Sequence, residues 1–258
     1  KFALSDLFTE GNFGIKEVEV NLITERGINV RLKHGVDVRS ELVVVDFSTV
    51  QNIVLSNEKI ALSLNDTEGD YSAYTNVNST MYGSYNFGTD LSALDVSAIA
   101  EIYELHGENK TIEVFASNGA KNVLIRIPVT IITKSLTSGA EFKEATYCAN
   151  PSEGEKNKGA YYILVHNLNV SDTSFTASDD DWINLGEAGF AGTIDGRGKK
   201  LVGVNLTYSL GIFRSLKNAT IKNLEIEIAS LNVGSEFASV FACYADDTVF
   251  EDITITLT

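Results

Sequence analysis

The second half of the chain consists of short apolar segments of β character that alternate with glycine or asparagine turns. These segments cover residues 192–194, 200–204, 212–213 and 219–228. None is long enough to bury a face of its own, and none has helical spacing. Such a chain is stabilised when each segment stacks on the one before it, as in a parallel β-helix. The pattern therefore predicts stacked parallel strands in this part of the chain.

Two of the segments form a repeat. Residues 221–226 (IKNLEI) and 250–255 (FEDITI) lie 29 positions apart and share the same alternation, and Phe213 and Phe241 lie 28 positions apart. We interpret them as two rungs of one ladder. A solenoid needs about three or more rungs and a terminal cap. The pattern thus predicts that the chain is part of something longer, or else that another subunit covers its last strand.

The first half of the chain shows the two-residue period of β-strands. Apolar and polar positions alternate over 18–22 and 28–32, on either side of a turn at 25–27, which predicts a hairpin. Further apolar or alternating runs follow at 42–45, 53–55, 60–64, 111–115 and 123–132. About seven short strands in a region of this length predict a β-sandwich of immunoglobulin-like type.

Two features of this region modify the strand pattern. Pro128 lies inside the run 123–132. Because proline cannot donate a hydrogen bond to a neighbouring strand, this strand is expected at the edge of a sheet. Residues 91–106 have apolar positions near helical spacing, which favours a short inserted helix over a strand.

The character of the sequence changes at Leu136. Residues 139–149 are amphipathic and predict a short helix, and residues 160–165 predict an apolar strand. We therefore expect a mainly β protein of two domains. The first is an immunoglobulin-like β-sandwich over residues 1–134. The second, over residues 135–258, is a capping helix followed by the first rungs of a parallel β-helix.

The charge of the chain limits its partners. It carries 35 acidic and 20 basic residues, a formal net charge of −15. No cluster of Lys and Arg is present to neutralise phosphates, so neither nucleic acid nor an anionic membrane surface is an expected partner. No apolar run approaches the ~18 residues that a membrane-spanning helix requires, so no membrane insertion is expected.

The sequence gives few indications of cellular location. It begins at Lys1 without a charged and then apolar leader, which fits a cytosolic protein or a secreted protein whose leader was removed. Cys148 and Cys243 are too few for a disulfide framework. Buried thiols are expected, with a single bridge as the alternative. Three isolated histidines without metal-ligand spacing are expected at the surface or in turns: His34, His106 and His166.

A series of motifs runs through residues 136–258. In order they are YYILVHNLNVSD, D-x-W-I-x-L-G, F-x-G-T-I-D-G-x-G-K-x-L-x-G and L-G-I-F-x-S-L-x-N-A-T-I-K-N-L. The series resembles the start of right-handed β-helix regions in secreted bacterial surface proteins that carry GLUG-type repeats. The positions that carry the resemblance are Trp182, Gly186, Phe190, Gly192, Asp195, Gly196, Gly198, Gly203, Phe213 and Asn223. The chain departs from the pattern at Arg214, where the family has glycine.

This resemblance implies a location and a role. Members of the family are adhesins, surface proteases and gut-bacterial surface proteins, in which the segment is a spacer and display platform rather than a reaction centre. The first half of the chain is similar in type to the bacterial immunoglobulin-like domains that often precede such a segment. The resemblance therefore implies a secreted or cell-surface bacterial protein.

Aromatic side chains gather in the polar segment 65–90, and tyrosines among Asn and Ser suit contact with a sugar or a protein. An indole ring such as that of Trp182 also stacks on sugars. The alternative is that the tyrosines cap the sandwich core and that Trp182 plugs the mouth of the β-helix. The candidate binding residues are Tyr71, Tyr74, Tyr82, Tyr85 and Trp182.

One acidic cluster is a candidate metal site. Asp179, Asp180 and Asp181, with Asp172 and Glu187 nearby in sequence, offer the oxygen ligands that Ca²⁺ prefers. Their spacing is not that of a D-x-D-x-D-G loop, so a solvated loop is the alternative. No cofactor other than Ca²⁺ is expected.

The sequence contains no evident reactive constellation. Residues 195–198 (DGRG) lack the GK[ST] ending of a phosphate loop and predict a tight turn. The carboxylates at Glu225 and Glu227 are sparse, and ladders of charged and threonine side chains account for them. We expect a non-catalytic adhesion or display module that contacts a host or dietary glycan or a surface protein. The alternative is the N-terminal fragment of a carbohydrate-active β-helix enzyme, a polysaccharide lyase or glycosidase, with paired carboxylates on further rungs.

Overall fold

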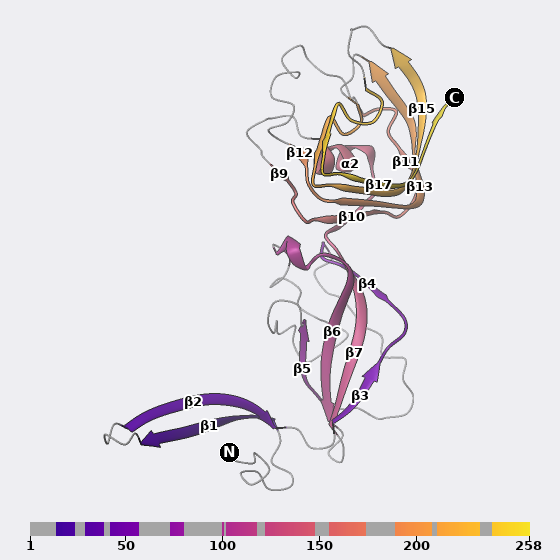
Figure 1. The fold of residues 1–258 in the computed structure, drawn as a ribbon. Coiled ribbons are helices and arrows are strands. Elements are labelled where there is room, and N and C mark those ends of the chain that lie inside the picture. The colour runs from indigo at the N-terminus through magenta and orange to yellow at the C-terminus, as the bar shows by residue number, and fades with distance from the viewer. Residues whose placement is uncertain are drawn as a thin grey trace.

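The computed structural model describes residues 14–23, 29–38, 42–56, 73–79, 100, 102–117, 122–147, 155–173, 189–207, 211–232 and 239–258. The described residues are mainly in β-strands, arranged as a hairpin, a mixed sheet and a stack of parallel strands (Figure 1). The mainly β fold class predicted from the sequence is confirmed.

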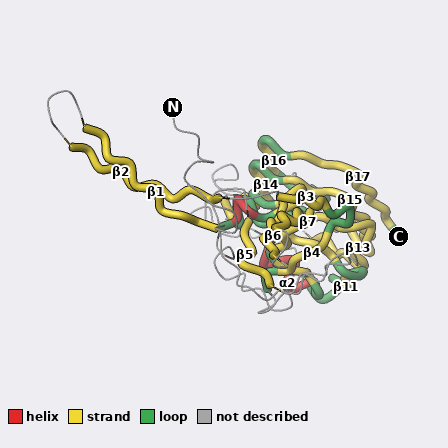
Figure 2. The backbone as a smooth tube through the Cα atoms, turned by 90° about the horizontal axis from the view of Figure 1, so that it is seen from below, coloured by secondary structure: helices red, strands yellow, loops and turns green. Residues whose placement is uncertain are grey.

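The first two strands form the predicted hairpin. β1 (Gly14–Ile23) and β2 (Asn29–Val38) pair antiparallel, with Gly14 opposite Val38 and Ile23 opposite Asn29. The hairpin is a separate two-stranded sheet, and in Figure 2 it extends away from the other strands.

The second sheet has the order β3-β7-β6-β5, and β4 also pairs with β7. Its strands are β3 (Leu42–Asp46), β4 (Gln51–Val54), β5 (Ala73–Ser79), β6 (Gly107–Ser117) and β7 (Asn122–Ile132). β3 and β4 run parallel to successive parts of β7, whereas β5, β6 and β7 are antiparallel neighbours. The described residues between 42 and 132 form one sheet and β1 and β2 form another, so the immunoglobulin-like sandwich predicted for residues 1–134 stays a prediction.

The prediction that the strand containing Pro128 lies at a sheet edge is wrong. β7 is an interior strand, with β6 on one side and β3 and β4 on the other. β3 pairs with β7 as far as Arg126, and β4 begins to pair at Val129. Pro128 therefore lies opposite the break between β3 and β4, where the missing N–H leaves no ladder bond unmade.

Of the segment predicted as a helix at 91–106, the structure describes Ala100 and residues 102–106. Ala100 is in α-helical conformation, and Tyr103–Leu105 form a 3₁₀ turn, η2. The rest of the segment lies outside the described residues.

The helix predicted at the start of the second domain is confirmed as α2 (Gly139–Thr146). It begins at the N-cap Ser138. Ser138–Glu141 has the sequence of a capping box, but the Glu141 carboxylate bonds to Thr137, the residue before the N-cap. The Ser138 hydroxyl accepts a hydrogen bond from the Glu141 N–H at 3.2 Å. The Glu141 carboxylate accepts from the N–H of Thr137 at 2.8 Å and lies 2.9 Å from the Lys134 ammonium.

These contacts make the cap sensitive to pH. The hydrogen bond from Lys134, followed by those from Thr137, lowers the pKa of Glu141 from 4.5 to about 2. A lowered pKa in the native state stabilises the fold above pH 4.5, and this contribution is lost as the pH falls toward 2. Glu141→Gln should therefore lower the melting temperature at pH 7, with a deficit that shrinks between pH 4.5 and 2 in a thermal unfolding series. The exposed Glu144 of the same helix serves as control, since Glu144→Gln should leave the melting temperature at pH 7 close to that of the parent chain.

The chain from Lys134 onward forms two parallel sheets. The first has the order β8-β10-β13-β15-β17, with β11 also on β13, and the second has the order β9-β12-β14-β16. The strands are β8 (Lys134–Leu136), β9 (Glu155–Lys156), β10 (Tyr161–Leu164), β11 (Leu168–Asn169), β12 (Gly189–Phe190), β13 (Thr193–Thr207), β14 (Ser215–Lys217), β15 (Thr220–Asn232), β16 (Tyr244–Asp246) and β17 (Val249–Leu257). Because the chain returns three times to the same two sheets, this region is a β-solenoid, as the sequence predicted.

The register of the strands confirms the sequence repeat. Ile221 of β15 lies opposite Phe250 of β17, and Ile226 lies opposite Ile255. Phe213 and Phe241 stack at a ring distance of 4.9 Å. The 29-residue spacing read from the sequence is therefore one coil of the solenoid.

A column of phenylalanines runs through the solenoid core. Phe142 of α2 contacts Phe213 at a centroid distance of 5.5 Å, Phe213 contacts Phe241, and Phe241 contacts Phe250 at 5.0 Å. Phe142 and Phe213 are fully buried. Edge and tilted ring contacts of this kind add to the stability gained from burial.

Each coil bends at a residue with left-handed backbone. Asn223 in β15 and Asp252 in β17 occupy equivalent places and have φ of 53° and 51°. Asn and Asp tolerate this conformation better than other residues with a side chain. Arg214, where the resemblance expects glycine, also has a positive φ of 56°, which explains why glycine suits that position.

Candidate functional site

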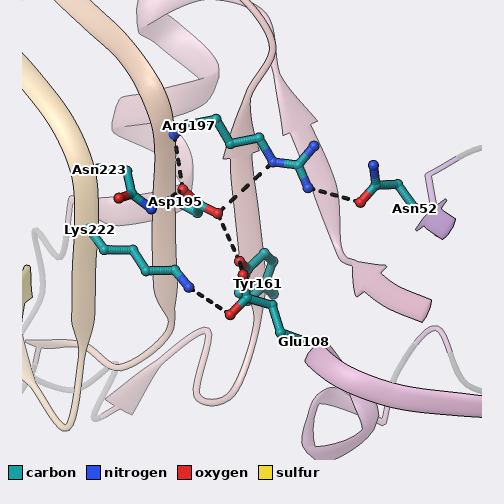
Figure 3. A network of polar contacts seen from close by, with 7 residues as sticks. All are labelled: Asn52, Glu108, Tyr161, Asp195, Arg197, Lys222 and Asn223. Atoms are coloured by element: carbon teal, nitrogen blue, oxygen red, sulfur yellow. Dashed lines mark hydrogen bonds and ion pairs between the residues drawn. The ribbon is translucent and has the colours of Figure 1, made fainter. Parts of the chain in front are cut away.

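Polar side chains from both halves of the chain meet where the solenoid adjoins the mixed sheet (Figure 3). β4 and β6 contribute from the mixed sheet, and the three coils that contain β10, β13 and β15 contribute from the solenoid. The junction network consists of Asn52, Glu108, Tyr161, Asp195, Arg197, Lys222 and Asn223.

The backbone brings the two halves together at Thr133, the residue between β7 and β8. Its N–H donates to the Tyr161 carbonyl at 2.8 Å, and its hydroxyl accepts from the Tyr161 N–H at 2.8 Å. Ile132, Tyr161 and Ile163 form a small buried cluster against Val54 of β4. The two halves are therefore joined both by hydrogen bonds to the backbone of Tyr161 and by a small apolar cluster.

His106 also belongs to this junction. It directly follows the 3₁₀ turn η2, which fits the turn position that was one of its two predicted places, but it is not at the surface. The residue is 5% exposed, and its Nδ1 lies 2.7 Å from the Thr133 hydroxyl. The ring packs beside Tyr103 at 5.2 Å. The hydrogen bond with the Thr133 hydroxyl gives the buried imidazole a polar partner and so lowers the free-energy cost of its burial. His166, by contrast, is exposed as predicted.

Asp195 is the buried carboxylate of the network, at 5% exposure. Its Oδ1 accepts from the N–H of Arg197 at 2.9 Å and from the Asn223 amide at 3.0 Å. Its Oδ2 accepts from the Tyr161 hydroxyl at 2.9 Å. Residues 195–198, predicted as a tight turn between rungs, form a bend inside β13. Arg197 and Gly198 have φ of 50° and 69°, and the register with β15 shifts between Asp195 and Lys199. Asp195 thus both closes this bend and joins two coils.

Tyr161 connects the solenoid to the mixed sheet. Its hydroxyl lies 2.9 Å from Glu108 Oε1 as well as from Asp195, and with a single hydrogen it donates to one carboxylate at a time. Burial, together with the neighbouring carboxylates, raises the pKa of Tyr161 far above its ordinary value, so the phenol stays a neutral donor.

Two cations complete the network. The Lys222 ammonium donates to Glu108 Oε2 at 2.8 Å and lies 5.6 Å from the centre of the Tyr161 ring. The Arg197 guanidinium donates to the Asn52 side-chain oxygen at 3.0 Å. Side chains of β13 and β15 therefore each reach a different strand of the mixed sheet.

This arrangement is suited to holding parts together. In an acid–base pair, two carboxylates flank a space into which a substrate bond enters. Here the Tyr161 hydroxyl lies between the two carboxylates, within hydrogen-bonding distance of both Glu108 and Asp195. The remaining oxygens of the two carboxylates accept from Lys222, Asn223 and the Arg197 backbone. All four carboxylate oxygens of Glu108 and Asp195 therefore have hydrogen-bond partners within the junction.

Tyr161→Phe tests this assignment. In this variant Asp195 Oδ2 loses the hydrogen bond from the phenol and keeps the Arg197 Nε, 4.0 Å away, as a neighbour. A buried acceptor that loses its partner costs about 1–3 kcal/mol, so we expect a loss of unfolding free energy of this size in urea titrations. Tyr244→Phe, at an exposed phenol of β16, is the matched control and should change stability by less than about 0.5 kcal/mol. Equal effects of the two variants would contradict a joining role for Tyr161.

Most of the predicted binding and metal residues lie outside the described part of the chain. These are Tyr71, Tyr82, Tyr85, Trp182, Asp179, Asp180 and Asp181. Tyr74 is in β5, where its backbone lies opposite Ala116 of β6. Among the described residues, no group of three or more His, Cys, Asp and Glu is placed to hold a metal ion. The Ca²⁺ and sugar-contact hypotheses therefore stay predictions.

The carboxylates on the outer face of β15 form the predicted ladders. Glu225 lies opposite Lys200 on one side and Thr254 on the other, and Glu227 lies opposite Thr256. The Lys200 ammonium is 2.6 Å from Glu225 and its pKa is raised by this contact. Such exposed pairs contribute little stability each, and here they continue the stacking at the surface.

Cys243 is a free thiol that is half-buried, and burial raises its pKa. This agrees with the buried thiol expected from the sequence. Cys148 lies outside the described residues.

Comparison of the chain with protein-family models, with curated proteins and with solved structures finds no match. In the described part of the chain, no helix is both long and apolar enough to cross a membrane. The site therefore has to be interpreted from its own geometry.

The sequence analysis missed the junction residues Tyr161, Glu108 and Lys222. One signal was available, because a tyrosine in a strand that is apolar on both faces needs a partner for its hydroxyl. The identity of that partner was not predictable, since Glu108 is 53 positions away in the chain.

Proposed function

We propose that this chain is a non-catalytic module of a secreted or cell-surface bacterial protein, which displays a surface for adhesion or for contact with a host or dietary glycan. The observation that carries the proposal is the junction network. Contacts between domains are often small and allow relative motion. Here side chains of three successive coils join β4 and β6, and Thr133 adds backbone bonds. A solenoid attached in this way is a firm support for the mixed sheet.

The position of Tyr74 supports a display role. β6 begins at the junction with Gly107, and Tyr74 of β5 lies opposite Ala116 near the other end of β6. At about 3.3 Å per residue, this is roughly 30 Å along the strand from the junction. β5, the described part of the tyrosine-rich segment 65–90, therefore begins its pairing with β6 at the end that lies away from the solenoid. Tyrosines in such a segment supply flat, partly polar contact area for sugars or proteins.

The finer parts of the proposal rest on the sequence. An immunoglobulin-like fold for residues 1–134 rests on the number of short strands that the sequence predicts there. A right-handed coil direction and a GLUG-type relationship for residues 136–258 rest on the motif series described above. The same resemblance supports an extracellular location. The acidic net charge of −15 fits a soluble surface protein that does not bind polyanions.

A glycan array with the full chain tests the contact function. We expect binding to a subset of glycans, and a loss of at least about ten-fold in affinity, or 1.4 kcal/mol, when Tyr71, Tyr74, Tyr82 and Tyr85 are all replaced by alanine. Tyr244→Ala, at an exposed tyrosine of the solenoid, is the control and should bind as the parent chain does. Absence of binding to both glycans and host surface proteins would overturn the proposal.

The same glycans separate the display role from the enzyme alternative. Incubation of the chain with each bound polysaccharide should leave its chain length and its number of reducing ends unchanged. Release of new reducing ends, or of unsaturated sugars, would show a glycosidase or lyase and overturn the non-catalytic assignment.

A further inference from the structure

The two ends of the solenoid differ, because a helix covers one end and the last coil forms the other. At the β8 end, helix α2 lies over the interior of the coils and buries Phe142 completely (Figure 1). At the other end, β16 and β17 are the last strands of their sheets. In the described part of the chain, no strand pairs with their outer edges. Solenoids need a polar cap at an end that faces water, and an uncovered strand edge is a site for pairing with another strand.

The side chains at the β17 end have the pattern of a core and not of a cap. Three columns of apolar residues run in register through β13, β15 and β17. The columns are Ile194, Ile221 and Phe250; Leu201, Ile226 and Ile255; and Val204, Ile228 and Leu257. Their members on β13 and β15 are at most 2% exposed, whereas those on β17 are 44 to 69% exposed. The last coil thus exposes positions that an adjacent coil covers everywhere else.

The charged residues at the β17 end indicate which charge a segment that covers this end would carry. Asp195, Lys222 and Glu251 form a fourth column, in which the sign alternates from coil to coil. Among residues 239–258 four are acidic and none is basic. A second copy of the chain facing this end with the same coil would bring like charges together, which is unfavourable. The β8 end of a second copy does not offer a free edge to β17 either, because α2 covers that end and the mixed sheet is joined to it.

We propose that the β16–β17 edge binds one further coil of solenoid type, added parallel to β17. This coil has apolar residues over Phe250, Ile255 and Leu257, a basic residue over Glu251, and Asn, Asp or Gly at the bend over Asp252. Added strands gain main-chain hydrogen bonds, and the alternate side-chain positions supply specificity. The inference is independent of the proposed display role, because it rests on the coil register alone.

A chain extension tests the proposal. A copy of residues 205–229 placed directly after Thr258 continues the coil in phase and brings the copies of Ile221, Lys222, Ile226 and Ile228 over β17. We expect hydrogen exchange of the β17 amides to slow by about ten-fold or more relative to the parent chain. In the matched control the copies of Ile221, Ile226 and Ile228 are serine, and exchange should stay at the parent rate. Replacing the copy of Lys222 by glutamate should make the β17 amides exchange several-fold faster than they do in the apolar extension.

Two results would overturn the proposal. The first is equal β17 exchange in the apolar extension, the serine extension and the parent chain, which would show that this edge does not accept a coil. The second is a dimer of the parent chain in sedimentation velocity, with β17 amides protected and with Ile255→Asp restoring the monomer while the outward Thr254→Asp does not. That result would make a second copy the occupant. A parent chain that sediments as a monomer with fast β17 exchange supports the proposal.

Discussion

Gly196→Ala is expected to destabilise the solenoid more than any other single methyl addition at the 195–198 bend. A Cβ at this position would lie 2.4 Å from the Asn223 carbonyl oxygen and 2.8 Å from the Leu224 Cα. Both atoms belong to the backbone of the next coil, so relief of the clash requires the two coils to separate. Overpacking of this kind costs about 1–3 kcal/mol, and we expect the upper end of this range in urea unfolding followed by far-ultraviolet circular dichroism.

The same bend offers a matched control at Gly198. A Cβ there would meet no atom within 4 Å, but φ is +69°. Gly198→Ala therefore carries only the cost of a left-handed residue with a side chain, about 1 kcal/mol. If Gly198→Ala proved as destabilising as Gly196→Ala, the close approach of the coils would not be the reason for glycine at position 196.

Phe213→Ala is expected to have the largest effect of any core substitution in the aromatic column. The ring is fully buried between Phe142 of the capping helix and Phe241 of the last coil. Truncation of a buried phenylalanine to alanine costs about 3–5 kcal/mol, because both the transfer free energy and the contacts around the cavity are lost. The measurement is the free energy of unfolding in urea. Phe213→Leu keeps most of the volume and provides a milder variant if the alanine variant does not accumulate in folded form.

Phe250→Ala is the control within the same column. Phe250 stacks on Phe241 at 5.0 Å but is 47% exposed. Its truncation leaves no closed cavity, so the loss should stay near 1 kcal/mol or less. Similar losses for Phe213→Ala and Phe250→Ala would contradict an exposed last coil and would indicate that the β17 face is covered in solution. This pair therefore also bears on the further coil proposed above.

The parts of the fold that the sequence predicted are those with a local or periodic pattern. The hairpin of β1 and β2 follows from alternation on both sides of a short turn. Helix α2 follows from the amphipathic spacing of residues 139–149. The pairing of 221–226 with 250–255 follows from one repeat length. In each case a few neighbouring residues, or one spacing, contain enough information to define the structure.

The sequence was less informative where two patterned regions meet. The alternation around Pro128 favours an edge strand, because it does not reveal the break between β3 and β4 that accommodates a proline in an interior strand. The burial of His106 was not predictable, because its partner Thr133 lies 27 positions later. The candidate binding residues in the tyrosine-rich segment were chosen by composition, and with the exception of the Tyr74 backbone they lie outside the described residues.

The amino-acid sequence alone determined that this chain is mainly β and that its second half stacks coils of about 29 residues, since repeated apolar spacing leaves few other ways to bury the side chains. The tertiary structure alone decided that Tyr161, Asp195 and Glu108 share one hydrogen-bonded junction, and that the core columns end exposed on β17. Such contacts depend on how separately patterned units dock. Docking brings together residues that are distant along the chain and follow no common period.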